Sequence, residues 1–204
     1  MRHPMAKNFS SRGAVVLVVA LLSLSIGAGA TGEALPGKNG PEIGQPAPSF
    51  TLKDQNGKDV SLAALTKQGP VALVFYRSSE WCLACQLQLI KLQRRLKDIE
   101  ATGGRLVCIS YDSITTTKKF ADRKKITLPL LADPGSRTID AYGVRDPDAA
   151  SGKEGSAQHA IVVVDQQGLV RVRLYQVIYD EQPGVDALVK AFKEAQNIKE
   201  GTKP

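Results

Sequence analysis

Cysteine, aromatic residues and long apolar runs are all scarce in this chain of 204 residues. Three cysteines are too few for a small domain held together by several disulfides. Aromatic residues make up 5% of the chain and do not alternate with arginines, so the sequence does not predict nucleic-acid binding. No glycine-rich dinucleotide motif is present, and no organic cofactor is therefore expected.

The remaining composition is that of a globular protein. Hydrophobic residues make up 43% and charged residues 23%, which argues against a largely disordered chain. The length predicts one domain, or one small domain beside a short tail.

The one sustained apolar run lies near the N-terminus, where three basic residues precede it. Its unbroken part, Ala14–Leu22, is shorter than the span of about 20 residues that a transmembrane helix needs. A small-x-small pattern follows at Ala28–Ala30 and is typical of a cleavage site. The sequence thus predicts a secretory signal peptide over residues 1–30, with an uncleaved anchor as the alternative. We expect an exported, periplasmic protein that meets the membrane only transiently, through this segment.

Basic residues are in mild excess over acidic ones, which gives a formal net charge of +7. Removal of residues 1–30 takes three of the 27 basic residues and none of the 20 acidic ones, which lowers the excess to +4. The remaining charge is too small to suggest a nucleic-acid partner.

Beyond the predicted signal peptide, residues 31–42 are rich in glycine and proline and predict a flexible tether. Residues 43–197 are expected to form a single domain, and residues 198–204 a C-terminal tail. Periodicity and turn residues mark the predicted elements. The expected extended segments are Phe50–Leu52 with its continuation to Leu62, Val71–Tyr76, Leu106–Ser110, Leu128–Leu131, Ala160–Val164 and Leu169–Leu174. The expected helices are Cys82–Ile99, Ser113–Lys125, Arg137–Tyr142 and Val185–Ala195. This order of strands and helices predicts a three-layer α/β domain.

The chemistry of the sequence is concentrated in the segment Trp81–Cys85. Cys82 is expected at the N-terminus of a helix that follows a buried strand. Unpaired backbone N–H groups and the helix dipole favour a thiolate there. Cys85 lies one helical turn later, within reach of a mixed disulfide formed on Cys82. In the oxidising compartment of an exported protein, such a pair is a redox couple or a structural bridge.

Two other interpretations of the pair are a structural bridge and half of a zinc site. A structural bridge between Cys82 and Cys85 would close a very short loop and add little chain-entropy stabilisation. A structural zinc ion needs four ligands, and after residue 30 only Cys108 and His159 remain to complete such a set. The redox couple is therefore the favoured interpretation.

Several segments resemble a known family. The N-terminal ones are Gly44–Leu52, with Asp54 and Gly57, and Val60–Leu62. The later ones are Leu130–Pro134, Tyr142–Val144 and Ile161–Gly168. Together they resemble redoxins of the alkyl hydroperoxide reductase/thiol-specific antioxidant (AhpC/TSA, peroxiredoxin-like) family over about residues 43–195. The resemblance implies a thioredoxin-like α/β/α fold with a mixed central sheet. It also implies an antioxidant or thiol–disulfide oxidoreductase that acts on a peroxide or a protein disulfide and is reduced by an external thiol.

The chain departs from the pattern of this family at three places. Typical peroxiredoxins carry Pro-x-x-x-Thr/Ser-x-x-Cys, and here Ser79 matches the hydroxyl position relative to Cys82 while Phe75 stands where proline would be. His159 occupies the position at which thioredoxins have a cis-proline and peroxiredoxins tend to have an arginine. The Trp-Cys-x-x-Cys segment itself looks more like thioredoxin. The choice between a peroxide and a disulfide substrate stays open at this point.

Four further residues are candidates for roles around the pair. Aligned in this way, His159 faces Cys82, where it stabilises the thiolate, shuttles a proton or is an ordinary loop histidine. Arg77 either lowers the pKa of Cys82 or is a solvated surface residue. Trp81 is expected to pack and to take part in recognition, and Cys108, inside an apolar strand, to be a core residue.

The same residues allow a different function. Two thiolates and an imidazole suit copper, so Cys82, Cys85 and His159 are candidate metal ligands. Thioredoxin-fold copper chaperones use two cysteines and a histidine, although typically with a C-x-x-x-C spacing. The leading prediction is a thiol–disulfide oxidoreductase or thiol peroxidase with Cys82 as the attacking thiolate and Cys85 as the resolving thiol. The alternative is a copper-binding metallochaperone.

Overall fold

The structure is a computed structural model that describes residues 40–175, 186 and 188–193. These residues all belong to one compact unit. The predicted signal peptide, nearly all of the predicted tether and the predicted tail lie outside them, as does part of the predicted helix Val185–Ala195. Within the described part of the chain, no helix has the length and apolar character needed to cross a membrane.

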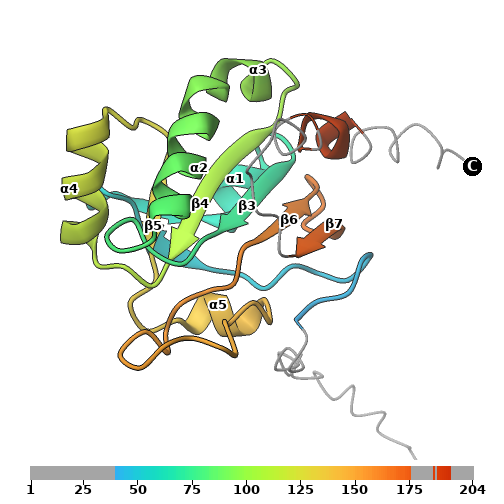
Figure 1. Cartoon of the computed structure of the whole chain (residues 1–204). Helices are drawn as coiled ribbons and strands as arrows, with labels where there is room; N and C mark the ends of the chain where they lie inside the picture. The colour runs from blue at the N-terminus through green and yellow to red at the C-terminus, as the bar shows by residue number, and fades with distance from the viewer. Residues whose placement is uncertain (1–39, 176–185, 187, 194–204) are drawn as a thin grey trace, which may run out of the picture. The chain divides into compact units, whose positions relative to one another are not determined.

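A seven-stranded sheet forms the centre of the domain (Figure 1). Its strands are β1 (Thr51–Lys53), β2 (Asp59–Ser61), β3 (Val71–Phe75), β4 (Arg105–Ser110), β5 (Leu130–Ala132), β6 (Ala160–Val164) and β7 (Val170–Tyr175). They lie in the order β2-β1-β5-β4-β3-β6-β7. The pairs β3–β4 and β4–β5 are parallel, and the other pairs are antiparallel. The prediction of a mixed central sheet is confirmed.

Helices cover both faces of this sheet. They are α1 (Leu62–Thr66), α2 (Leu83–Arg94), α3 (Leu96–Glu100), α4 (Ile114–Lys124) and α5 (Arg137–Ala141). Two hydrophobic clusters lie on opposite faces of the sheet, because successive residues of β3 belong alternately to one cluster and the other. The first cluster includes the buried hydrophobic residues of α2 and α4, and the second those of α1 and α5. This arrangement confirms the predicted three layers.

Most predicted elements are present with bounds close to those expected, but two predictions were wrong. The predicted helix Cys82–Ile99 is two helices, because the backbone leaves the helical region at Arg95 (φ −102°, ψ 9°). The side chain of Arg95 there pairs with Asp98 and with Asp186 from the C-terminal helical segment. Leu62, expected in an extended segment, begins α1, where Ser61 caps the helix by accepting a hydrogen bond from the Ala64 amide (3.2 Å).

Candidate active site

The site lies where the chain leaves the centre of the sheet and enters α2. All five residues of β3 are buried, so this strand gives the following loop a fixed starting point. Cys82 ends the loop as the N-cap residue of α2, with an extended backbone, and its Sγ accepts a hydrogen bond from the Cys85 amide (3.2 Å). The Cys82 sulfur thus lies at the positive end of the helix dipole, as the sequence predicts.

Cys82 and Cys85 form a disulfide, with their Cα atoms 5.2 Å apart. The two residues differ in access, because Cys85 is 0% exposed and Cys82 is 7% exposed. A thiol that approaches from outside therefore reaches the bridge at the sulfur of Cys82.

His159 lies directly beside this pair, at the residue before β6. Its Nε2 is 3.0 Å from the Sγ of Cys85. His159 therefore contacts the sulfur of the buried Cys85, whereas the family resemblance places it opposite Cys82. Burial lowers the pKa of His159, the positive charge of Arg77 lowers it further, and Asp146 opposes this shift. The imidazole is therefore neutral at pH 7.

Arg77, the second residue after β3, is engaged by a carboxylate. Its Nε is 3.2 Å from Asp146 Oδ2, and this carboxylate is almost fully buried while the arginine side chain is half-exposed. The structure thus gives Arg77 an acidic partner in the loop before β6.

The loop before Cys82 is held by a buried carboxylate that the sequence analysis missed. Asp112 Oδ1 accepts a hydrogen bond from Ser78 Oγ (2.7 Å). Its Oδ2 accepts one from the Ser79 amide (2.6 Å) and one from Ser79 Oγ (2.7 Å). All three residues are buried. The Ser79 hydroxyl, which matches the Thr/Ser position of the family pattern, is a donor to Asp112 in this structure. The only signal in the sequence was an acidic residue that closely follows the buried strand β4.

Trp81 lies at the rim of the site. Its Nε1 donates a hydrogen bond to the Tyr111 hydroxyl (2.9 Å), and the ring packs against the core on the α2 side of the sheet. The Lys153 ammonium lies 4.1 Å from the centroid of the indole ring, a cation–π geometry. Trp81 therefore joins the Cys82 loop to the segments that follow β4 and α5.

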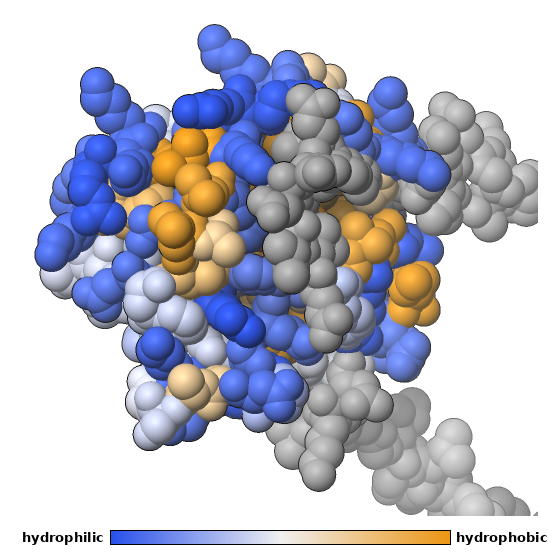
Figure 2. Space-filling model, viewed as in Figure 1, coloured by the Kyte–Doolittle hydropathy of each residue, from blue (hydrophilic) through white to orange (hydrophobic). Residues whose placement is uncertain are grey.

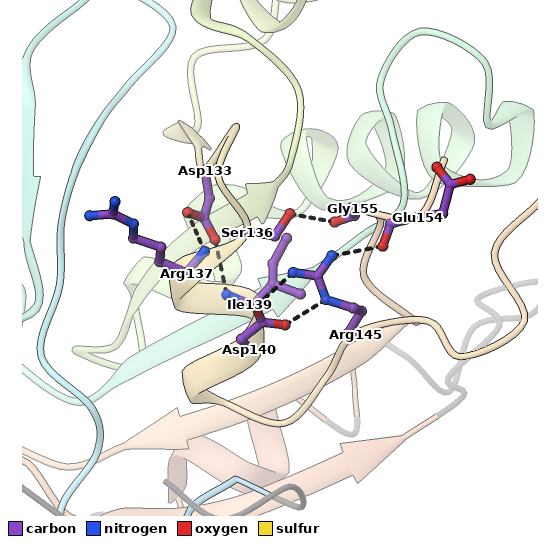
Figure 3. A network of polar contacts seen from close by, with 8 residues as sticks. All are labelled: Asp133, Ser136, Arg137, Ile139, Asp140, Arg145, Glu154 and Gly155. Carbon is purple, nitrogen blue, oxygen red and sulfur yellow. Dashed lines mark hydrogen bonds and ion pairs between the residues drawn. The ribbon is translucent and has the colours of Figure 1, made fainter. Parts of the chain in front are cut away.

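A polar network fixes the long segment that leads from α5 to His159 (Figure 3). Arg145 forms two hydrogen bonds with the Asp140 carboxylate (2.5 and 2.6 Å) and one with the Glu154 carbonyl (2.7 Å). The hydroxyl of Ser136 donates to the Gly155 carbonyl (2.8 Å). These contacts tie the two ends of this segment, at Arg145 and at Glu154–Gly155, to α5, and so position His159.

Another acidic residue holds the start of α5 itself. The carboxylate of Asp133 accepts hydrogen bonds from the amides of Arg137 (3.1 Å) and Ile139 (2.9 Å), as Figure 3 shows. Burial raises the pKa of Asp133, and these backbone hydrogen bonds oppose the shift.

Cys108 lies in β4, away from the bridge. It is a free thiol with 0% exposure, and burial raises its pKa strongly. A buried, protonated thiol packs as a small apolar residue, which confirms the prediction that Cys108 belongs to the core.

Comparison with known proteins gives consistent results. Residues 43–173 match the AhpC/TSA family. The chain is 34% identical over 152 residues to chloroplastic peroxiredoxin Q of Arabidopsis thaliana, a match that covers 74% of this chain and 67% of that protein. It is also 34% identical over 131 residues to alkyl hydroperoxide reductase E of Mycobacterium bovis, covering 63% and 82%. The crystal structure of peroxidoxin BcpB from Mycobacterium tuberculosis superposes with a TM-score of 0.65 at 24% identity, covering 78% of this chain and 98% of that one. The structural likeness confirms the predicted thioredoxin-like fold.

The copper-chaperone alternative is not supported. The candidate ligand atoms of Cys82, Cys85 and His159 do lie within 4.8 Å of one another. However, the family match and the relatives are those of peroxide-reducing redoxins. We therefore interpret this cluster as a thiol redox site.

Proposed function

The chain belongs to the AhpC/TSA family of redoxins, and on this basis we propose that it is a thiol-dependent peroxidase in which Cys82 is the attacking residue and Cys85 the resolving one. The observation that carries the proposal is the Cys82–Cys85 disulfide at the N-terminus of α2, inside the segment that matches the family. The bridge is the product that such a reaction leaves on the enzyme.

In the first step, the Cys82 thiolate attacks one oxygen of a hydroperoxide. An S–O bond forms and the O–O bond breaks, so that Cys82 becomes a sulfenic acid and the other oxygen leaves as an alcohol or water after protonation. The helix N-terminus supports this step because it stabilises the thiolate over the thiol.

In the second step, the Cys85 thiolate attacks the sulfur of the Cys82 sulfenic acid. An S–S bond forms, the S–O bond breaks and water leaves. An external thiol donor then reduces the bridge and returns both cysteines to thiols. The short distance between the two residues, with Cα atoms 5.2 Å apart, supports this direct resolution within α2.

The test is steady-state peroxidase activity with hydrogen peroxide and dithiothreitol. Cys82→Ser is expected to lose turnover, because no other cysteine at the site attacks the peroxide. In a single turnover without dithiothreitol, Cys85→Ser is expected to stop as the sulfenic acid of Cys82, which dimedone traps. Cys108→Ala is the matched control and should retain activity, since this thiol is buried away from the bridge. Full activity in both Cys82→Ser and Cys85→Ser would refute the proposal.

A protein disulfide is the competing substrate, and the same protein tests it. The rate at which the reduced enzyme reduces insulin disulfides is compared with its rate on hydrogen peroxide. A faster peroxide reaction supports the peroxidase, and a faster insulin reaction would reassign the substrate.

Export is a proposal that rests on the N-terminal segment alone. The basic residues, the apolar run and the small-x-small pattern of residues 1–30 support a cleaved signal peptide. Fusion of residues 1–35 to a reporter that is active only outside the cytoplasm tests it. Activity that disappears when Arg2, Lys7 and Arg12 are replaced by Glu is the expected result.

A further inference from the structure

Helix α2 has apolar residues on both of its faces. Cys85, Leu89 and Leu92 are buried against the sheet, as expected of an amphipathic helix. On the opposite side, Leu83 is 69% exposed and Leu87, one turn later, is 51% exposed. Paired leucines on the solvent face of a helix form an apolar patch of the kind that marks a contact surface.

This patch adjoins the accessible end of the disulfide. Leu83 directly follows Cys82, and the exposed Ala84 comes next. Figure 2 shows orange surface over α2, beside the blue surface of α4. A molecule that brings a sulfur atom to Cys82 therefore meets Leu83.

The same face of α2 becomes cationic toward the C-terminal end of the helix. Lys91 follows Leu87 after one further turn and is exposed, as is Arg94. The helix contains no acidic residue. Its solvent face thus combines apolar contact beside the bridge with positive charge further away, which is complementary to a partner that carries acidic groups around an apolar centre.

The reaction cycle requires a sulfur atom from another molecule at this place. The chain has three cysteines, two of them in the bridge, and the third is buried in β4. It therefore contains no thiol able to reduce the bridge itself. Because Cys85 is fully buried, the incoming thiolate must attack Cys82.

We propose that Leu83 and Leu87, with Lys91 and Arg94 beyond them, are the docking surface for a protein dithiol that reduces the bridge. This inference rests on the proposed function, because only a cycling bridge needs a reductant. The partner thiolate attacks Cys82 Sγ, an intermolecular S–S bond forms, and Cys85 leaves as a thiolate and takes up a proton. The second thiolate of the partner then attacks the partner's own bonded sulfur and releases Cys82. The partner becomes a disulfide, and the pair in α2 becomes a dithiol.

The test separates docking from chemistry by measuring the reduction of the bridge alone. The oxidised full chain is mixed with thioredoxin as a protein dithiol, or with dithiothreitol as a small one, and free thiols are trapped after rapid quenching. The double variant Leu83→Gln/Leu87→Gln keeps the local charge unchanged, so it adds no charge that would shift the pKa of Cys82. Ile43→Gln is the matched control, since Ile43 is 64% exposed in a segment outside α2.

For the double variant, we expect the ratio of the thioredoxin rate constant to the dithiothreitol rate constant to fall about tenfold or more. For Ile43→Gln, we expect this ratio of rate constants to equal that of the wild-type protein. Added salt should slow the thioredoxin reaction of the wild-type protein and leave the dithiothreitol reaction unchanged, because salt screens the contribution of Lys91 and Arg94.

Two results would overturn the inference. One is an unchanged ratio in the double variant, and the other is a wild-type protein that thioredoxin reduces no faster than dithiothreitol does. Failure of the proposed function gives a different result: hydrogen peroxide then does not oxidise the reduced protein, whatever the rate at which thioredoxin reduces the bridge.

Discussion

Cys82 and Cys85 are three positions apart, and their surroundings give them different tasks. Cys82 caps α2 and is the more exposed residue of the pair, whereas Cys85 is enclosed by the core and contacts His159. The difference follows from helix geometry, since a residue one turn beyond the N-cap points toward the sheet when the helix packs on it. The attacking and resolving roles are thus proposed from position as well as from residue type.

At the same scale, Asp112 is predicted to hold the loop that carries Cys82. Asp112→Ala removes the acceptor of three hydrogen bonds and leaves the donors of Ser78 and Ser79 buried and unpaired. We expect a loss of about 3 kcal/mol or more in the free energy of unfolding, because three buried donors lose their acceptor and each unsatisfied buried polar group costs about 1–3 kcal/mol. Urea denaturation measures this loss. Asp122→Ala is the control, since it removes only an exposed ion pair with Lys118. Equal effects of the two variants would contradict the role of Asp112.

His159 is predicted to make stability depend on pH in a defined direction. Burial and the positive charge of Arg77 hold its pKa below the ordinary value near 6.5, against the opposing effect of Asp146, so the unfolded chain binds the proton more readily than the folded one. The contribution of the neutral imidazole to stability is therefore complete above that value and is lost as pH falls below it. Urea denaturation of the wild type and of His159→Gln between pH 8 and pH 5 should show the wild type losing more stability below pH 6.5. Parallel curves would contradict this prediction.

Among the elements, α2 tests the layer arrangement most directly because both of its faces carry leucines. Leu89→Ala opens a cavity at a fully buried position and is expected to cost about 2–5 kcal/mol. Leu87→Ala removes an exposed side chain and is expected to change stability by less than about 0.5 kcal/mol. Thermal unfolding of the two variants measures the difference. Similar losses would mean that α2 does not present these faces as described.

The elements also show what a sequence can and cannot predict. β3 and the hairpin of β6 and β7 were predicted because a continuous apolar run and a turn between two runs are local signals. The break at Arg95 was missed because it coincides with ion pairs to Asp98 and to the distant Asp186. Asp112 was missed for the same reason, since its partners lie more than 30 positions away. The cysteine pair was identified because its spacing is itself the signal.

At the scale of the whole molecule, the bridge is expected to matter for chemistry more than for folding. It closes a loop of only a few residues, so the loop-entropy estimate of its contribution is about 2 kcal/mol. The oxidised and reduced proteins should therefore both be folded, and their free energies of unfolding should differ by about that amount. Denaturation with and without dithiothreitol measures the difference. Unfolding of the chain on reduction would identify the bridge as a structural one.

The central claim is that a peroxide converts the dithiol of Cys82 and Cys85 into the disulfide seen here. The most direct test is a single-turnover titration of the reduced protein with hydrogen peroxide, followed by alkylation of free thiols and peptide mass analysis. The mechanism predicts one Cys82–Cys85 bridge for each peroxide consumed, with Cys108 still a thiol. Peroxide that is not consumed, or that oxidises Cys108 while Cys82 and Cys85 remain thiols, would contradict it.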